Sequence, residues 1–177
     1  DVEGSSRITD AVMGALSGAT DVPAQGQGTM NNLTLGFPGR VYFETLGGGQ
    51  GASPRGDGPD AVHVAMSNTL NTPVEALEVA MPVRVERYSV RRGSGGTGLH
   101  RGGDGVVRRI RLLEDADVSL IAERRRSAPR GLGGGSDGTP GSTRIDDAPV
   151  SGKWRGRLSA GSVIEQRTPG GGGHGIA

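Results

Sequence analysis

The stretch Gly105-Val106-Val107-Arg108-Arg109-Ile110-Arg111-Leu112-Leu113 decides the fold class of this chain. Its Val, Ile and Leu residues are typical of a β-strand. Further strands are expected at residues 82–90, 118–122 and 162–166, and no helical pattern separates the strands of this half. The pattern therefore predicts an α+β, β-dominated fold with antiparallel sheets, Gly-rich turns and an N-terminal helix.

The expected N-terminal helix covers residues 5–17. Ser5 or Ser6 is suited to cap it, and Gly18 with Pro23 ends it. Apolar residues at helical spacing form one face, which is expected to pack on the sheets: Ile8, Val12, Ala15 and Leu16. Three further strands are expected after the helix, at residues 33–35, 40–45 and 62–66.

Glycine is unusually frequent, with 34 glycines and 10 prolines in 177 residues, a content at which low complexity must be considered. The glycines come in clusters at residues 47–51, 93–105, 131–135 and 170–173, separated by apolar stretches of strand length. Clustered glycines of this kind indicate tight turns and close backbone approach. A Gly-rich flexible tail is expected over residues 168–177.

Residues 93–98, Gly-Ser-Gly-Gly-Thr-Gly, match the dinucleotide-binding fingerprint and follow an expected strand. The helix that should receive the pyrophosphate is missing, because residues 99–105 contain too many glycines. A glycine-rich connection between strands is therefore favoured over a nucleotide site. Arg101 is the exception in this loop, since its guanidinium is suited to bind a carboxylate or phosphate.

Charge and composition exclude several classes of function. The net charge is +1, from 20 basic and 19 acidic residues, so no global field favours nucleic acid or an anionic membrane. Lys153 is the sole lysine, and no Gly-Lys-Ser/Thr phosphate loop occurs. The absence of cysteine excludes disulfides and thiolate chemistry. No apolar run is long enough to span a bilayer, and a cytoplasmic location is expected.

A polar block follows the expected strand at 62–66: Ser67-Asn68-Thr69-Leu70-Asn71-Thr72-Pro73-Val74-Glu75. Short hydroxyl and amide side chains at a strand end are suited to bind the oxygen and nitrogen atoms of a ligand. The same residues are also suited to cap a helix that begins near Pro73, with Glu75 in its first turn. The residues alone leave both interpretations open.

The three histidines, His63, His100 and His174, do not have metal-ligand spacing, and no metal site is predicted in this chain. His63 is interpreted as a core histidine unless it lies in a site. No Gly-x-Ser-x-Gly elbow stands out, so serine nucleophile chemistry is a minor possibility.

Eight blocks, occurring in the order of the family, together resemble the hydantoinase B/oxoprolinase family. They are Ser6-Arg7-Ile8-Thr9-Asp10-Ala11, Gln27-Gly28-Thr29-Met30-Asn31-Asn32, Tyr42-Phe43-Glu44-Thr45 with its glycines, Asn68-Thr69-Leu70-Asn71-Thr72-Pro73-Val74-Glu75, Val85-Glu86-Arg87-Tyr88, Gly102-Gly103-Asp104-Gly105, Glu123-Arg124-Arg125-Arg126 and Thr168-Pro169-Gly170-Gly171-Gly172-Gly173. The resemblance covers nearly the whole chain, and the joint occurrence of the blocks is more specific than any one of them.

The resemblance implies that residues 1–177 form a single C-terminal portion of a hydantoinase B-like subunit whose N-terminal part is missing. It implies an ATP-dependent hydrolase of cyclic amides, such as hydantoins or 5-oxoproline, with ATP handled by an A-type partner subunit or domain in a hetero-oligomer. A divalent metal is implied in the missing N-terminal part, and none in this chain. An ATP-dependent ketone carboxylase is the alternative reaction, and this chain alone is expected to be inactive.

Candidate site residues follow from the chemistry that such a substrate needs. Catalytic roles are assigned to His63 for proton transfer and to the carboxylates Glu44 and Glu75. Substrate binding is assigned to Asn68, Thr69, Asn71, Thr72, Gly48, Gly49 and Arg101, with glycine amides as donors to an oxyanion. A non-catalytic scaffold or subunit interface, using the run Arg124 to Arg126, is the competing hypothesis, and a nonfunctional remnant of a truncated gene is a third.

Overall fold

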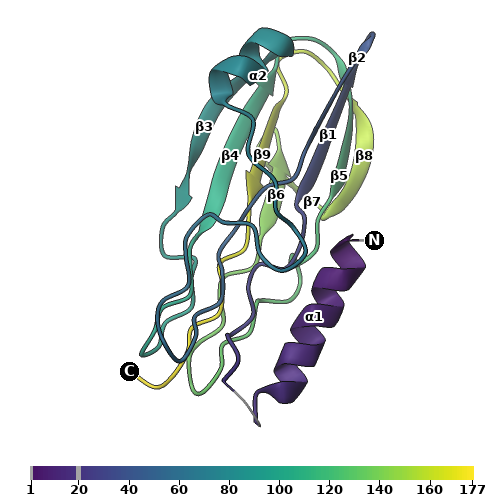
Figure 1. Cartoon of the computed structure of the whole chain (residues 1–177). Coiled ribbons are helices and arrows are strands. Elements are labelled where there is room, and N and C mark those ends of the chain that lie inside the picture. Colours follow the sequence, from purple (N-terminus) through teal and green to yellow (C-terminus); the bar gives the residue numbers. More distant parts are fainter. Residues whose placement is uncertain (1, 19–20) are drawn as a thin grey trace.

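Two antiparallel sheets pack face to face in the computed structural model, which describes residues 2–18 and 21–177 (Figure 1). The first sheet has the order β2-β1-β5-β8, with β1 (Asn32–Phe37), β2 (Arg40–Glu44), β5 (Ala116–Ile121) and β8 (Lys153–Leu158). The second has the order β3-β4-β9-β6-β7, with β3 (Val83–Arg91), β4 (Gly105–Leu112), β6 (Ser142–Ile145), β7 (Ala148–Val150) and β9 (Val163–Arg167). The predicted β-dominated, antiparallel fold is confirmed.

The hydrophobic core lies between these sheets. Leu35 of β1 and Leu120 of β5 face Ile110 of β4 and Ile164 of β9, and all four are at most 1% exposed. Leu77 of the short helix α2 (Val74–Ala80) belongs to the same cluster. Burial of each such side chain contributes about 1.5–3 kcal/mol to stability. Alternation along the strands therefore supplies the apolar layer that holds the sheets together.

Most predicted strands occur within one or two residues of their expected bounds, but the strand expected at residues 62–66 does not. Val62 makes an isolated bridge to Gly48, and Ala65 has a left-handed backbone with φ of +53°. Residues 62–66 therefore turn instead of continuing as a strand. The sequence reasoning also missed β6, β7 and β8, which are short or rich in arginine and lysine.

Helix α1 (Val2–Leu16) begins earlier than predicted and is oriented differently. It lies beside the irregular lower half of the molecule rather than on a sheet (Figure 1). The predicted apolar face points to solvent, since Ile8 is 66% exposed, Val12 51% and Leu16 44%. Polar side chains join α1 to the body instead, beginning with Arg7, which donates to the carbonyl of Gly28. No helix in the described residues is long and apolar enough to cross a membrane.

The lower half consists of five extended segments, which we call the glycine bundle: residues 22–28, 47–62, 93–104, 129–139 and 168–175. Residues 168–175 run through its centre. Their amides three positions apart donate to the same neighbour: Gly170 and Gly173 to segment 129–139, and Gly171 and His174 to segment 93–104, all at 2.9–3.1 Å. A repeat of three residues is the period of a polyproline II helix, which makes no internal hydrogen bonds and must find its partners in neighbouring segments.

Glycine is required where these segments touch, because a side chain would meet backbone. A Cβ atom on Gly170 would lie 1.9 Å from the carbonyl oxygen of Ser94, and one on Gly171 would lie 2.0 Å from that of Gln50. The expectation of close backbone approach is therefore correct. Most of the clustered glycines, however, lie in extended segments and not in tight turns.

The flexible tail predicted at residues 168–177 is not what the structure contains. Thr168 to Gly173 are buried, and the chain remains hydrogen-bonded to the bundle as far as Gly175, whose amide donates to the carbonyl of Leu132 at 3.0 Å. The prediction failed because glycine runs specify a flexible linker and a packed polyproline II segment equally well.

We predict that Gly171→Ala destabilises the chain strongly, since the new methyl group has no space. Overpacking of this kind costs about 3 kcal/mol of unfolding free energy. Gly56→Ala is the matched control, because no atom lies within 4 Å of a Cβ built there. Urea denaturation measures both variants, and equal unfolding free energies would contradict the packed bundle.

Candidate functional site

A buried ion pair between the two sheets forms the centre of the candidate site. Glu44, the last residue of β2, pairs with Arg108 of β4, and their side chains are 4% and 1% exposed. Both sit at inward positions of alternating strands: Val41 and Phe43 on β2 point outward, so Glu44 points inward. Burial of two charges is expensive unless they pair, so each residue depends on the other.

Two tyrosines complete the environment of Arg108. Its Nη2 donates to the hydroxyl of Tyr42 at 3.4 Å, and its Cζ lies 4.9 Å from the ring centre of Tyr88. Burial, together with the neighbouring carboxylate of Glu44, raises the pKa of the Tyr42 hydroxyl above its ordinary value. Tyr42 therefore remains protonated and is a hydrogen-bond donor at neutral pH.

The polar block at residues 67–75 attaches to this pair through its backbone. The Oε1 atom of Glu44 accepts a hydrogen bond from the amide of Thr72 at 3.1 Å. Pro73 then precedes α2 as its N-cap residue, and no side chain caps the helix by a hydrogen bond. Thr72 and Asn71 are thus not side-chain caps, which removes the local explanation for the polar block.

His63 is held by two hydroxyl groups of the same block. Its Nδ1 lies 3.3 Å from the Oγ of Ser67, and its Nε2 lies 3.1 Å from the Oγ1 of Thr69. Burial lowers the pKa of the His63 ring below its ordinary value of 6.5, and the negative charge of Glu44 acts in the opposite direction. The ring is therefore neutral at neutral pH and able to accept a proton.

The other predicted residues of the polar block do not join this cluster. Asn68 and Asn71 are exposed, and within the described residues their side chains make no hydrogen bond. Glu75 is exposed in the first turn of α2. The amides of Asn68 and Asn71 are thus open to a ligand, whereas Glu75 points to solvent.

Three further predicted residues belong to the glycine bundle. The amide of Gly48 donates to the carbonyl of Val62 at 2.9 Å, and that of Gly49 donates to Pro169 at 2.9 Å. Neither amide is free to stabilise an oxyanion, so that prediction is corrected. Arg101 pairs with Asp60 at 3.0 Å, an internal partner in place of the expected ligand.

The structure also corrects the interpretation of residues 124–126 as a solvated run. Arg124 is buried, and its Nη2 contacts Asp10 of α1 at 2.6 Å. Arg125 is only partly exposed, and its Nη1 donates to the side chain of Asn31 at 2.9 Å. Of the three arginines, only Arg126 is exposed.

The sequence reasoning missed Arg108 and Tyr42. The signal was present in β4, because Val106, Arg108 and Ile110 share one parity and the two apolar members are core residues. An arginine on the core face of a strand indicates a buried partner.

No group of three or more His, Asp or Glu residues that could hold a metal ion is found in the described part of the chain. The cluster around Glu44 offers one carboxylate, already bound to Arg108, and one imidazole, already between two hydroxyls. Its chemistry is therefore derived from these side chains alone.

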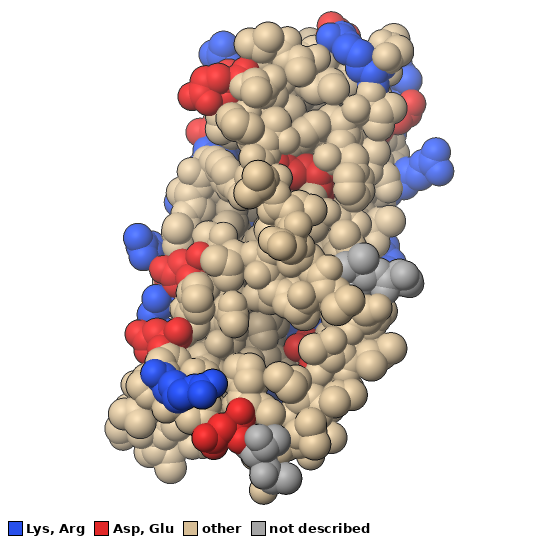
Figure 2. Space-filling view, in the orientation of Figure 1, with Lys and Arg blue, Asp and Glu red and all other residues tan. Residues whose placement is uncertain are grey.

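Charged side chains are scattered over the face seen in Figure 2 and do not form a single-sign patch. Together with the net charge of +1, this agrees with the absence of a nucleic-acid footprint expected from composition. The site is consequently one for a small molecule or a protein partner.

Comparison with known proteins gives consistent matches. A family model described as Hydantoinase B/oxoprolinase matches residues 1–177. The chain is 42% identical over 176 residues to 5-oxoprolinase 1 of Arabidopsis thaliana, covering 97% of this chain and 14% of that protein. It is 35% identical over 182 residues to the B-type subunit of a putative D-/L-hydantoinase of Pseudomonas sp. (strain NS671), covering 95% and 30%.

A solved structure shares the fold. The ATP-dependent caprolactamase from Pseudomonas jessenii superposes with a TM-score of 0.72 at 22% identity, covering 94% of this chain and 32% of that one. This chain therefore spans about a third or less of each of these proteins.

We predict that Arg108→Met lowers the unfolding free energy by about 3–5 kcal/mol, because Glu44 would be left buried without a partner. Arg111→Met on the same strand is the control. Its ion pair with Glu86 is partly exposed, so its loss costs about 1 kcal/mol or less. A chemical denaturation series that finds both variants equally stable would contradict the importance of the buried pair.

A second prediction concerns pH. Since the pKa of His63 is lowered in the folded chain, its contribution to stability is complete above 6.5 and is lost as the pH falls through the folded-state pKa. Wild type should lose stability relative to His63→Gln between about pH 8 and about pH 5.5. The check is the difference in urea midpoint at each pH, and a constant difference would show that His63 does not titrate abnormally.

Proposed function

The chain belongs to the hydantoinase B/oxoprolinase family, and we propose that it forms part of the B-type component of an ATP-dependent enzyme that hydrolyses cyclic amides. The relative from Arabidopsis thaliana is named a 5-oxoprolinase, and the one from Pseudomonas is named as the B-type subunit of a hydantoinase. The second name supports a partner of the A type, which would activate the substrate with ATP.

One observation carries the assignment of the chemistry to this chain. A neutral histidine, His63, lies beneath a loop of exposed amide and hydroxyl side chains and within the field of a buried carboxylate, Glu44. A neutral imidazole in such a place can take a proton from an attacking water and return it to the leaving nitrogen. This proton transfer is the role proposed for His63.

The polar loop is proposed to hold the ring of the substrate. Asn68 and Asn71 offer amide donors to the oxygen that becomes negative when water attacks, and one such donor contributes about 3–4 kcal/mol to the transition state. Thr69, which is hydrogen-bonded to His63 Nε2, keeps the imidazole oriented until the substrate arrives. The Thr72 amide bound to Glu44 fixes the end of the loop.

Glu44 is assigned a positioning role instead of the base role expected from sequence. Arg108 neutralises its charge, and the amide of Thr72 occupies its second oxygen. Glu75 has no contact with the cluster and is left without a role. The ion pair therefore joins the loop to the sheets, and His63 does the proton transfer.

We predict that His63→Ala, and separately the double change Asn68→Ala and Asn71→Ala, abolish most ATP-dependent turnover of 5-oxoproline or hydantoin. The assay uses the complete B-type protein that contains this region together with its A-type partner. Loss of one proton-transfer group costs about 100-fold or more in rate. His174→Ala is the control, because His174 lies in the glycine bundle and bonds through its backbone to His100.

Turnover that survives both changes would favour a scaffold role instead. The exposed apolar face of α1, formed by Ile8, Val12 and Leu16, is the feature that supports a structural contact within a larger assembly. In that case the variants would still assemble with the A-type partner and retain full activity.

A further inference from the structure

A cleft of about 590 Å³ lies between α1 and the glycine bundle, outside the cluster around Glu44. Its polar lining includes Asp10 on α1, Gln25, Gln50 and Arg130, and Ala65, two residues beyond His63, forms another part of the wall. The volume falls in the range of small-molecule sites, about 300–1,000 Å³.

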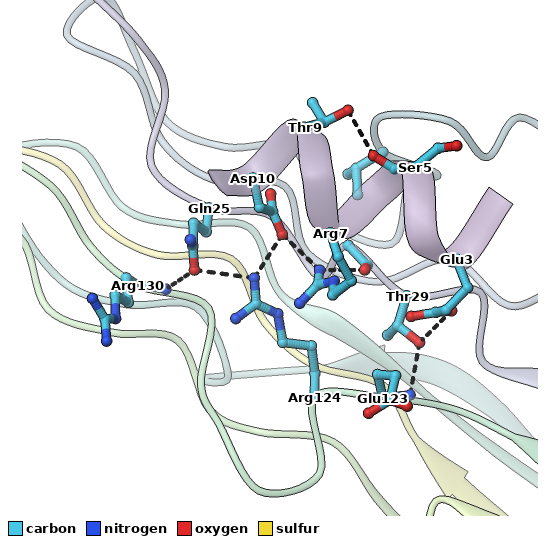
Figure 3. A network of polar contacts seen from close by, with 12 residues as sticks. Glu3, Ser5, Arg7, Thr9, Asp10, Gln25, Thr29, Glu123, Arg124 and Arg130 are labelled. Atoms are coloured by element: carbon cyan, nitrogen blue, oxygen red, sulfur yellow. Dashed lines mark hydrogen bonds and ion pairs between the residues drawn. The ribbon is translucent and has the colours of Figure 1, made fainter. Parts of the chain in front are cut away.

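The charges beside this cleft do not balance. Asp10 is shared by two guanidinium groups, since the Nη2 atoms of Arg7 and Arg124 both lie 2.6 Å from its Oδ2 (Figure 3). Arg130 lies next to them, and its backbone amide donates to Gln25 Oε1 at 3.1 Å. Its guanidinium has no carboxylate partner anywhere in the described residues. Three cations therefore surround one anion.

The remaining acidic groups near α1 are engaged elsewhere. The Oε2 of Glu3 accepts from the amide of Met30 at 2.8 Å and from the Thr29 hydroxyl at 3.1 Å, at the other end of the helix (Figure 3). Glu123 pairs with Lys153 at 2.8 Å. Neither carboxylate compensates the surplus charge at the cleft.

The pKa of Arg124 reflects this imbalance. Burial lowers it first, the positive charge of Arg7 lowers it further, and that of Arg130 adds to the effect, while Asp10 opposes them. A second anion at this place would offset the repulsion between the guanidinium groups. The cleft is therefore electrostatically suited to an anionic ligand.

Amide groups supply the second half of the recognition. Gln50 is exposed, and its side chain makes no hydrogen bond within residues 2–18 and 21–177. A primary amide presents both a donor and an acceptor, which complement the carbonyl and N–H of a cyclic amide. Arg130 presents a planar fork, which matches a carboxylate with two parallel hydrogen bonds.

We propose that this cleft binds a small cyclic amide that carries a carboxylate, with Arg130 on the carboxylate and Gln50 on the ring amide. The inference deepens the proposed function, since it names the substrate class and places its binding beside the loop of His63. 5-Oxoproline is the simplest compound of this class.

The test is isothermal titration calorimetry of the 177-residue chain with 5-oxoproline, without ATP or a partner. Arg130→Gln should weaken binding about tenfold or more, because a charge-assisted hydrogen bond is lost. Arg126→Gln is the matched control: Arg126 is the exposed member of the neighbouring run and does not line this cleft. Equal thermal unfolding of both variants shows that folding is unaffected.

Two further ligands separate the parts of the proposal. 2-Pyrrolidinone, the same ring without the carboxylate, should bind about tenfold or more weakly than 5-oxoproline. Inorganic phosphate that binds as tightly as 5-oxoproline and displaces it would overturn recognition of the ring. No binding by wild type, or unchanged binding by Arg130→Gln, would overturn the proposal as a whole.

The result is distinct from that of the turnover assay. Loss of turnover in His63→Ala together with no binding at the cleft would retain the proposed function and remove this site. Binding at the cleft together with full turnover in His63→Ala would retain the site and remove the assignment of His63.

Discussion

The absence of a side chain at the buried glycines is the constraint on which the rest of the structure depends. Residues 168–175 pass through the centre of the bundle, where neighbouring backbones lie closer than any Cβ atom permits. Their amides and carbonyls are satisfied by other segments, so a polyproline II chain can be buried without unpaired polar groups. The bundle in turn fixes the position of Val62, which precedes His63, through its bridge to Gly48.

Buried arginines organise the two regions to which function is assigned. Arg108 pairs with Glu44 between the sheets and leaves one carboxylate oxygen to hold the loop that covers His63. Arg124 pairs with Asp10 and ties α1 to the bundle through charge instead of apolar packing. The first pair is balanced and positions neighbouring groups. The second carries surplus positive charge, which is the property expected of an anion site.

The candidate site was only partly predictable. Glu44, His63, Thr69 and Thr72 do lie together, because the polar block follows the turn after Val62 and its backbone reaches Glu44. Gly48 and Gly49 were misassigned, since sequence shows that a glycine amide is unhindered but not whether another carbonyl already occupies it. Arg108 was missed because it lies 64 positions from Glu44, and long-range pairing of charges leaves no local pattern.

The sequence by itself determined the β-dominated class, most strand positions and the existence of an N-terminal helix, because these depend on local periodicity and residue type. Tertiary structure alone decided three other features: that α1 turns its apolar face outward, that the glycine runs pack into a bundle, and that two arginines are buried. Each depends on contacts between segments far apart in the chain. Burial and pairing energies at such contacts exceed the local preferences that a sequence displays.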